Sequence, residues 1–283
     1  MRVHLKLENL QPIGSFKMRG ALNAMKSRDP ETLKRGVYTA SAGNMAQGVA
    51  WGARAMGIAC TAIVPDGAPK TKLDAIERLG ASIVKVPFTT WWRVMEEHRY
   101  PGIEGLFIHP VADPAVIAGN GIIGLEILEE LPDTDLILVP FGGGGLISGI
   151  AIAALSKRPG IRVTACEVET AAPLDASFRE GSPQTIEYRP SFVDGIGGRS
   201  VLSEMWPMVR GLVEESIVVS LEEIAEAIRL LVQRNRVVAE GAGAASVAAQ
   251  LREAKEGNVV CVVSGGNIDP KKLARILTGE LPD

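Results

Sequence analysis

The clearest signal in the chain is the stretch LILVPFGGGGLISGIAIAAL at residues 136–155. An apolar run typical of a buried strand leads into four glycines, Gly142, Gly143, Gly144 and Gly145, and a helical pattern follows at once. Glycines allow a backbone to close tightly, and the amides at a helix N-terminus bind anions. The stretch therefore predicts an anion-binding loop, with a phosphate as the expected ligand.

Two other interpretations of this loop stay open. It is not a Walker loop, because no GK[ST] follows, and Ile147 stands where a dinucleotide-binding fingerprint has its third glycine. Glu167, at the end of the next apolar run, could still bind a ribose, so a nicotinamide-dependent dehydrogenase remains an alternative. The other alternative is a glycine-rich turn needed only for packing.

Outside this loop, short β-rich runs alternate with longer helical patterns along almost the whole chain. This alternation predicts βαβ units and an α/β fold with parallel sheets, whose ligands bind beyond the carboxyl ends of the strands. The predicted strands cover residues 3–8, 36–41, 60–65, 82–87, 106–110, 136–141, 161–168, 216–220 and 258–264.

Composition restricts the class of ligand and the compartment. The 283 residues are enough for about two domains, and a net charge of -3 with both signs scattered excludes a basic stripe for nucleic acid. Cys60, Cys166 and Cys261 stand alone in apolar runs, as in a reducing compartment. Neither a signal peptide nor a membrane span is recognisable. We expect a cytoplasmic protein that binds small molecules.

Two further turns follow predicted strands. SAGN, residues 41–44, leads into a helix and offers amides that suit a carboxylate. VVSGGN, residues 262–267, presents Ser264 at a strand tip, just before the predicted start of a helix, where a hydroxyl can make one uncharged hydrogen bond. Helix capping is an equally good explanation for either turn alone. Asp194 and Glu240, in glycine-rich segments, are weaker candidates.

The segment LENLQPIGSFKMRG, residues 7–20, places a lysine at the start of a helix. Ser15 is the predicted N-cap, so Lys17 falls in the first helical turn, where the partial positive charge of the helix disfavours a second one. Such a lysine either binds an anion, extends into solvent, or becomes a neutral nucleophile. By itself the segment does not distinguish these three roles.

Jointly, these motifs resemble the fold type II pyridoxal phosphate (PLP) enzymes, and within them the threonine/serine dehydratase and serine racemase branch. LKLENLQPIGSFKMRGA is similar to the lysine segment of that branch, SAGNMAQGVA to its substrate-carboxylate loop, FGGGGLISG to its phosphate loop and VVSGGN to the partner of its pyridine nitrogen. The similarity runs in the same order from about His4 to Asn267. It implies two open parallel-sheet domains of the tryptophan synthase β-like class.

The resemblance also implies a role for each motif. Lys17 is expected to be the Schiff-base lysine and the catalytic base, with Phe16 beside the cofactor ring. The other implied cofactor-binding residues are Asn44, Gly142, Gly143, Gly144, Gly145, Leu146, Glu240 and Ser264. The implied substrate-binding residues are Ser41, Ala42, Gly43, Asn44 and Gln47.

Domain boundaries and partners follow from the same resemblance. We expect residues 1–35 and 111–283 to form a large PLP-binding domain and residues 36–110 a small domain that carries the substrate loop. The helix and strand that usually precede LKLENLQ in the family are missing from this chain. A homodimer is the expected assembly.

The expected reaction is β-elimination from a hydroxy amino acid such as L-threonine or L-serine, which gives a 2-oxo acid and ammonia. Racemases of the branch carry a protonating serine where this chain has Ala42, so dehydration is favoured over racemisation. Serine racemase, a 3-hydroxyaspartate lyase and a catalytically silent PLP-binding protein remain alternatives. The branch's divalent-metal site would map to Glu167, the Ala171 carbonyl and Pro173, and because proline has no side-chain oxygen we expect no metal.

Overall fold

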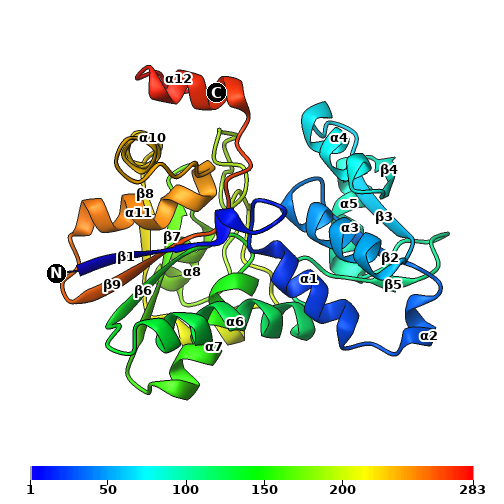
Figure 1. The fold of residues 1–283 in the computed structure, drawn as a ribbon, viewed down its shortest axis with the longest axis horizontal. Helices are drawn as coiled ribbons and strands as arrows, with labels where there is room; N and C mark the ends of the chain where they lie inside the picture. The colour runs from blue at the N-terminus through cyan, green and yellow to red at the C-terminus, as the bar shows by residue number, and fades with distance from the viewer. Residues whose placement is uncertain (1, 283) are drawn as a thin grey trace. The chain divides into compact units, whose positions relative to one another are not determined.

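The computed structural model describes residues 2–282, which divide into two compact units (Figure 1). The smaller unit is Phe16–Asn120, and the larger unit holds the residues up to Ser15 together with those from Gly121 onward. Each unit contains one open, wholly parallel sheet. The fold class predicted from the sequence is therefore confirmed.

The sheet of the smaller unit has the strand order β4-β3-β2-β5. Its strands are β2 (Val37–Ala40), β3 (Cys60–Pro65), β4 (Ser82–Val86) and β5 (Leu106–Phe107). Side chains of β2 alternate between two cores: Val37 packs with α1 and α3, whereas Tyr38 packs with α5 on the other face. Because both faces are covered, the strands are almost continuously apolar.

The helices of the smaller unit are α1 (Lys17–Lys26), α2 (Pro30–Leu33), α3 (Asn44–Met56), α4 (Lys70–Arg78) and α5 (Phe88–Glu97). α1 lies directly on α3, and this contact is close because Gly52 of α3 leaves room for the side chain of Met25. A left-handed Gly57 ends α3. α6 (Pro114–Glu130) begins in the smaller unit and ends in the larger one.

The sheet of the larger unit has the order β1-β9-β6-β7-β8. Its strands are β1 (Arg2–Leu7), β6 (Leu136–Pro140), β7 (Arg162–Val168), β8 (Ser216–Val219) and β9 (Asn258–Val263). β1, the first strand of the chain, adds to the sheet edge by pairing with β9, with Arg2 opposite Asn258. The first and last strands of this unit are therefore neighbours.

Helices cover both faces of this sheet (Figure 1). α11 packs on β6, β7, β8 and β9 and is covered in turn by α10, while α7 packs on β6 and β7. The helices are α7 (Gly145–Lys157), α8 (Pro173–Glu180), α9 (Trp206–Leu212), α10 (Leu221–Leu230), α11 (Gly241–Glu253) and α12 (Pro270–Leu277), with a 3-10 turn at Glu8–Leu10 and a π-helical turn at Leu231–Asn235. Among the described residues, no helix is both long and apolar enough to cross a membrane.

Two local predictions are wrong. Ser15 does not cap α1: the cap position is Phe16, and the Ser15 hydroxyl is buried and makes no hydrogen bond within the described residues. No helix begins directly after Ser264, because the chain stays irregular until Asp269 caps α12. The compact units group residues 16–35 and 111–120 with the smaller sheet, and the domain boundaries drawn from the sequence stay a prediction.

Candidate functional site

Lys17 is the first residue of α1, in the smaller unit. Its Nζ atom donates a hydrogen bond to the carbonyl oxygen of Pro110, at 2.9 Å, and lies 5.0 Å from the centre of the Phe16 ring. The helix start is pressed against α3, because a methyl group on Gly48 would lie 3.1 Å from the Lys17 carbonyl. The lysine backbone is thus fixed one turn from the start of α3.

The turn Ser41–Asn44 follows β2 and begins α3. The Gly43 amide donates to Oγ of Ser41 at 3.1 Å, and α3 starts at Asn44 without a side-chain cap among the described residues. The four turn residues and Gln47 are half-buried, and a methyl group on Gly43 would meet no atom within 4 Å. The turn therefore leaves open space beside Gly43, at the start of a helix, and such a start suits a carboxylate.

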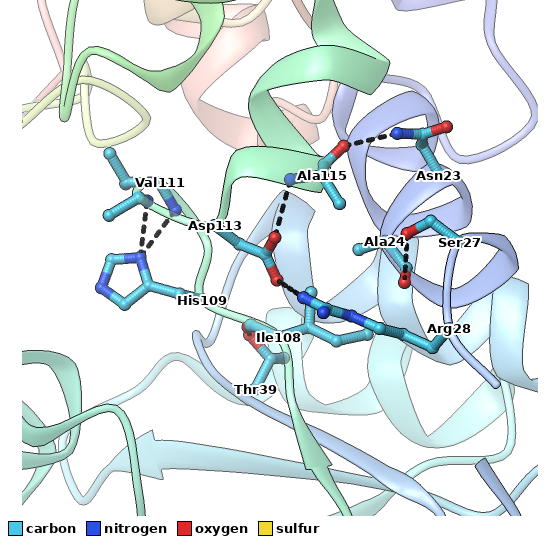
Figure 2. A network of polar contacts seen from close by, with 11 residues as sticks. Asn23, Ala24, Ser27, Arg28, Thr39, Ile108, His109, Val111, Asp113 and Ala115 are labelled. Atoms are coloured by element: carbon cyan, nitrogen blue, oxygen red, sulfur yellow. Dashed lines mark hydrogen bonds and ion pairs between the residues drawn. The ribbon is translucent and has the colours of Figure 1, made fainter. Parts of the chain in front are cut away.

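A loop at residues 109–115, here called the His109 loop, supplies the Pro110 carbonyl. It follows β5, which pairs with β2, and so begins at the same edge of the sheet as the Ser41–Asn44 turn. Figure 2 shows Nδ1 of His109 accepting two backbone amides, from Val111 at 3.1 Å and from Ala112 at 2.7 Å. Burial, with a smaller contribution from His98, lowers the pKa of His109 from 6.5 to about 3, so the ring is neutral.

The larger unit carries the tetraglycine loop at the carboxyl end of β6. Gly144 has φ +96°, a conformation that other residues rarely adopt, and a methyl group there would lie 3.0 Å from Cγ2 of Val209. α7 begins at Gly145 with no side-chain cap in the described structure. The start of a helix carries a partial positive charge, which suits an anion.

The other glycine-rich segments of this unit pack around that loop. A methyl group on Gly142 would lie 3.3 Å from Cα of Ile196, and one on Gly195 would lie 2.8 Å from Cβ of Ala242. Gly243, in the first turn of α11, in turn touches the carbonyl of Gly265. Segments 142–145, 195–196, 240–243 and 264–265 therefore form one continuous surface, which includes Glu240 and Ser264.

Residues before Lys17 close this surface on one side. Ser15 forms an antiparallel bridge with Gly265, and the Gly266 amide donates to the Gly14 carbonyl at 2.9 Å. The Ser15 hydroxyl is buried without a hydrogen-bond partner among the described residues. An orphaned buried hydroxyl is costly and is expected where a ligand completes its hydrogen bonding.

Glu167 has a structural role in this unit. Its carboxyl group accepts hydrogen bonds from the amides of Leu174 at 2.9 Å and Asp175 at 2.8 Å, in the first turn of α8, and from the Ser216 hydroxyl at 2.7 Å. Burial has the largest effect on the pKa of Glu167 and raises it to about 7, although these three hydrogen bonds lower it. Both carboxyl oxygens hold α8 and β8 together.

The chain was compared with proteins of known identity. The family model described as pyridoxal-phosphate dependent enzyme matches residues 1–265. The L-threonine ammonia-lyase of Thermotoga maritima is 42% identical over 97% of this chain and 69% of its own length. The catabolic L-threonine dehydratase of Escherichia coli strain K12 is 40% identical, over 97% of this chain and 85% of its own. Maize serine racemase has a TM-score of 0.88 and 33% identity, over 98% and 86% of the two chains.

The chain belongs to the pyridoxal-phosphate dependent enzyme family. Its relatives confirm the predicted branch, that of the threonine/serine dehydratases and serine racemase. The cofactor is therefore pyridoxal phosphate, and a nicotinamide-dependent dehydrogenase is excluded.

The residues present fit this cofactor. The start of α7 has no side-chain cap within the described residues and suits a phosphate. A residue other than glycine at position 144 would distort it. The orphaned Ser15 hydroxyl offers a further hydrogen bond, and Lys17 places a primary amine at the start of α1.

The sequence did not reveal the contacts of His109 and Pro110. None of the three histidines stands at metal-ligand or catalytic-triad spacing, so local sequence does not single out His109. A histidine followed by proline at the end of a strand, in FIHP, was the available signal, since loops at carboxyl ends of parallel strands carry function.

Proposed function

We propose that this protein is a PLP-dependent dehydratase that converts a hydroxy amino acid, with L-threonine as the main substrate, to a 2-oxo acid and ammonia. The observation that carries the proposal is the placement of Lys17 at the start of α1, with its amine on the Pro110 carbonyl and its backbone against the first turns of α3. The similar enzymes named for L-threonine support that substrate.

Lys17 is proposed to hold the cofactor at rest and to remove the α-proton of the substrate in turnover. A base at this position must be neutral, and the partial positive charge at the start of α1 opposes protonation of the amine. The carbonyl of Pro110 directs the amine by its hydrogen bond. Phe16, at 5.0 Å from the amine, provides an apolar ring surface beside it.

The turn Ser41–Asn44 is proposed to bind the substrate carboxylate. Its amides at the start of α3 attract a negative charge, while Gln47, one turn further on, is also half-buried and adds an amide group. Asn44 is the proposed partner of the cofactor's phenolic oxygen.

The larger unit is proposed to bind the cofactor's phosphate and ring. The amides of Gly142 to Leu146 suit the phosphate, and Ser264, at the end of β9, is the proposed neighbour of the ring nitrogen. When bound, PLP supplies the electron sink that stabilises the carbanion. A neutral hydroxyl at Ser264 does not hold the ring nitrogen protonated as a carboxylate would, which favours loss of the β-hydroxyl over a long-lived carbanion.

Ala42 supports dehydration over racemisation. Racemisation requires a second group that delivers a proton to the opposite face of the α-carbon, and an alanine methyl cannot carry one. The amino acid loses its hydroxyl as water, and hydrolysis of the released enamine regains one water and frees ammonia. The net change is thus deamination.

A panel of hydroxy amino acids tests the proposal. The purified protein with PLP is mixed in turn with L-threonine, L-serine and 3-hydroxyaspartate, and 2-oxo acid and ammonia are measured together. Equal amounts of both products from L-threonine, at the highest kcat/KM of the panel, are expected. Release of neither product with unchanged chirality of every substrate would favour the silent binding protein, and a change of chirality without 2-oxo acid would favour the racemase.

The homodimer and the cytoplasmic location are part of the same proposal. The three cysteines are buried and form no disulfide, as expected in a reducing compartment. Light scattering of the purified protein measures its assembly directly.

A further inference from the structure

The His109 loop contacts α1 near the start of the loop, through Pro110, and again at its far end, through Ala115. At the start of the loop, Nδ1 of His109 accepts the Val111 and Ala112 amides, so the chain curls around the ring. Between these residues, Pro110 is held with its carbonyl oxygen on the Lys17 amine. The imidazole thus shapes the turn that presents an acceptor to Lys17.

The protonation of the ring follows from its partners. Because Nδ1 accepts two amides, it carries no hydrogen, so the hydrogen lies on Nε2, which donates to the Met95 carbonyl at 3.2 Å. The side chain is only 2% exposed. A neutral ring fixed at both nitrogens makes the turn rigid.

The far end of the loop is held by the last turn of α1 and the residues after it. Oδ1 of Asp113 accepts the Ala115 amide at 2.8 Å, and Oδ2 lies 3.5 Å from the Arg28 guanidinium. Nδ2 of Asn23 donates to the Ala115 carbonyl at 2.7 Å, and Figure 2 shows these contacts side by side. α1 therefore binds the His109 loop at two places, through Lys17 at its start and through Asn23 near its end.

We propose that His109 is a positioning residue for Lys17, acting through the Pro110 carbonyl. The neutral imidazole accepts the Val111 and Ala112 amides and so fixes the turn. The turn orients the Pro110 carbonyl, which accepts the hydrogen bond of the Lys17 amine. His109 itself is not placed on the substrate. This inference rests on the proposed role of Lys17 as the catalytic amine, but the geometry it describes exists without cofactor or substrate.

Two substitutions of His109 isolate the acceptor. In His109→Asn, the side-chain oxygen stands at the same bond distance along the chain as Nδ1 and can accept the Val111 and Ala112 amides, as in a common turn. In His109→Leu, the acceptor is lost at similar bulk. Both variants also remove the donor to the Met95 carbonyl, so the loss of that hydrogen bond does not contribute to the difference between them.

The experiment uses the full-length apoprotein and two measurements. Hydrogen exchange with mass spectrometry reports the amides of Val111 and Ala112, and reductive methylation with formaldehyde at fixed pH, followed by peptide mass spectrometry, reports the reactivity of Lys17. In His109→Leu, both rates are expected to rise about three- to tenfold, which is the change expected from the loss of one ordinary hydrogen bond. In His109→Asn, both are expected to return towards the wild-type rates. Lys26, exposed in the last turn of α1, is the internal control and should not change.

Three results would overturn the inference. Faster exchange of the loop amides with unchanged methylation of Lys17 would make His109 a structural residue of the loop only. No change in either rate would remove even that role, and an Asn variant that behaves like the Leu variant would show that the acceptor is not what matters.

A further variant, Asp113→Ala, tests the inference if His109→Leu does not fold. Asp113→Ala frees the opposite end of the loop by removing the acceptor of the Ala115 amide and the partner of Arg28. It should raise the methylation rate of Lys17 in the same direction, and an unchanged rate would count against the inference. Because no turnover is measured, failure of this test is distinct from failure of the proposed dehydratase activity.

Discussion

The Lys17 amine and the Pro110 carbonyl oxygen are 2.9 Å apart, although the two residues are 93 positions apart in the chain. The parallel sheet of the smaller unit brings them together. β5 pairs with β2, so the His109 loop and the Ser41–Asn44 turn leave the same sheet edge, and α1 packs on the helix that follows the turn. A basic amine, a backbone acceptor and the start of a helix therefore share one end of one compact unit.

Substitution of Ala42 by serine should introduce racemase activity. The hydroxyl supplies the proton carrier that alanine lacks, so Ala42→Ser is expected to form D-serine from L-serine while 2-oxo acid formation falls. Chiral chromatography of the reaction mixture measures both products. Ala59→Ser, an exposed position in the same unit, is the matched control. An Ala42→Ser enzyme that forms no D-serine would contradict the two-face account.

Substitution of Gly144 by alanine should weaken cofactor binding. The residue has φ +96°, which costs an L-residue about 1–2 kcal/mol, and the added methyl group would press on Val209. The Kd for PLP, measured by absorbance titration, is expected to rise about tenfold or more, since 1.4 kcal/mol corresponds to a factor of ten. Gly211→Ala, in α9 with open space around it, should bind PLP as the wild type does. Equal Kd values for both variants would count against the phosphate role of the loop.

His109 should make the protein less stable in acid. The unfolded chain takes up a proton on this residue below pH 6.5, whereas the folded protein does so only near pH 3, so stability is full above 6.5 and is lost as the pH falls towards 3. The charged or titratable groups that lower the pKa from nearby are His98, with ring centres 4.4 Å apart, and Lys17.

Urea unfolding at pH 7 and pH 4.5 measures this dependence. The free energy of unfolding is expected to be lower at pH 4.5 than at pH 7, and His109 is expected to account for about 2–3 kcal/mol of that difference. His109→Asn has no group that titrates there and should lack this part of the pH dependence. An identical pH dependence in the variant and the wild type would show that His109 is protonated as easily folded as unfolded.

Removal of the Glu167 side chain should destabilise the larger unit. Glu167→Ala leaves two amides of α8 and the Ser216 hydroxyl without their acceptor, at about 2–4 kcal/mol in the free energy of unfolding. Thermal or urea unfolding measures the loss. Glu180→Ala, exposed at the end of α8, should change stability by less than about 0.5 kcal/mol. Similar stability of the two variants would rule out the capping role of Glu167.

Much of the architecture could be predicted because strand and helix patterns alternate regularly. Each of the nine predicted strands is present in residues 2–282, and α3 begins at Asn44, the last residue of the turn expected to lead into a helix. β5 is shorter than predicted, since after Phe107 the chain leaves the sheet for the His109 loop. Family, branch and cofactor are confirmed by the relatives, while the roles of individual site residues stay predictions.

What could not be predicted depends on tertiary contacts. Ser15 has the sequence signature of an N-cap, but its bridge to Gly265 directs the backbone differently and leaves Phe16 at the cap position. His109 has no catalytic partner nearby in sequence, and its partners are amides two and three residues ahead and a carbonyl on α5. Glu167 was considered for ribose or metal binding, whereas its oxygens accept the amides of α8. No local pattern encodes any of these contacts.

Borohydride reduction of the PLP-loaded protein tests the central claim most directly. The reagent fixes the cofactor irreversibly to the lysine that carries it, and peptide mass spectrometry then locates the added phosphopyridoxyl mass. The account predicts that mass on the peptide that contains Lys17, its absence in Lys17→Ala together with loss of 2-oxo acid formation, and its retention in Lys26→Ala. Fixation on another lysine of the wild-type protein, or none at all, would contradict the account.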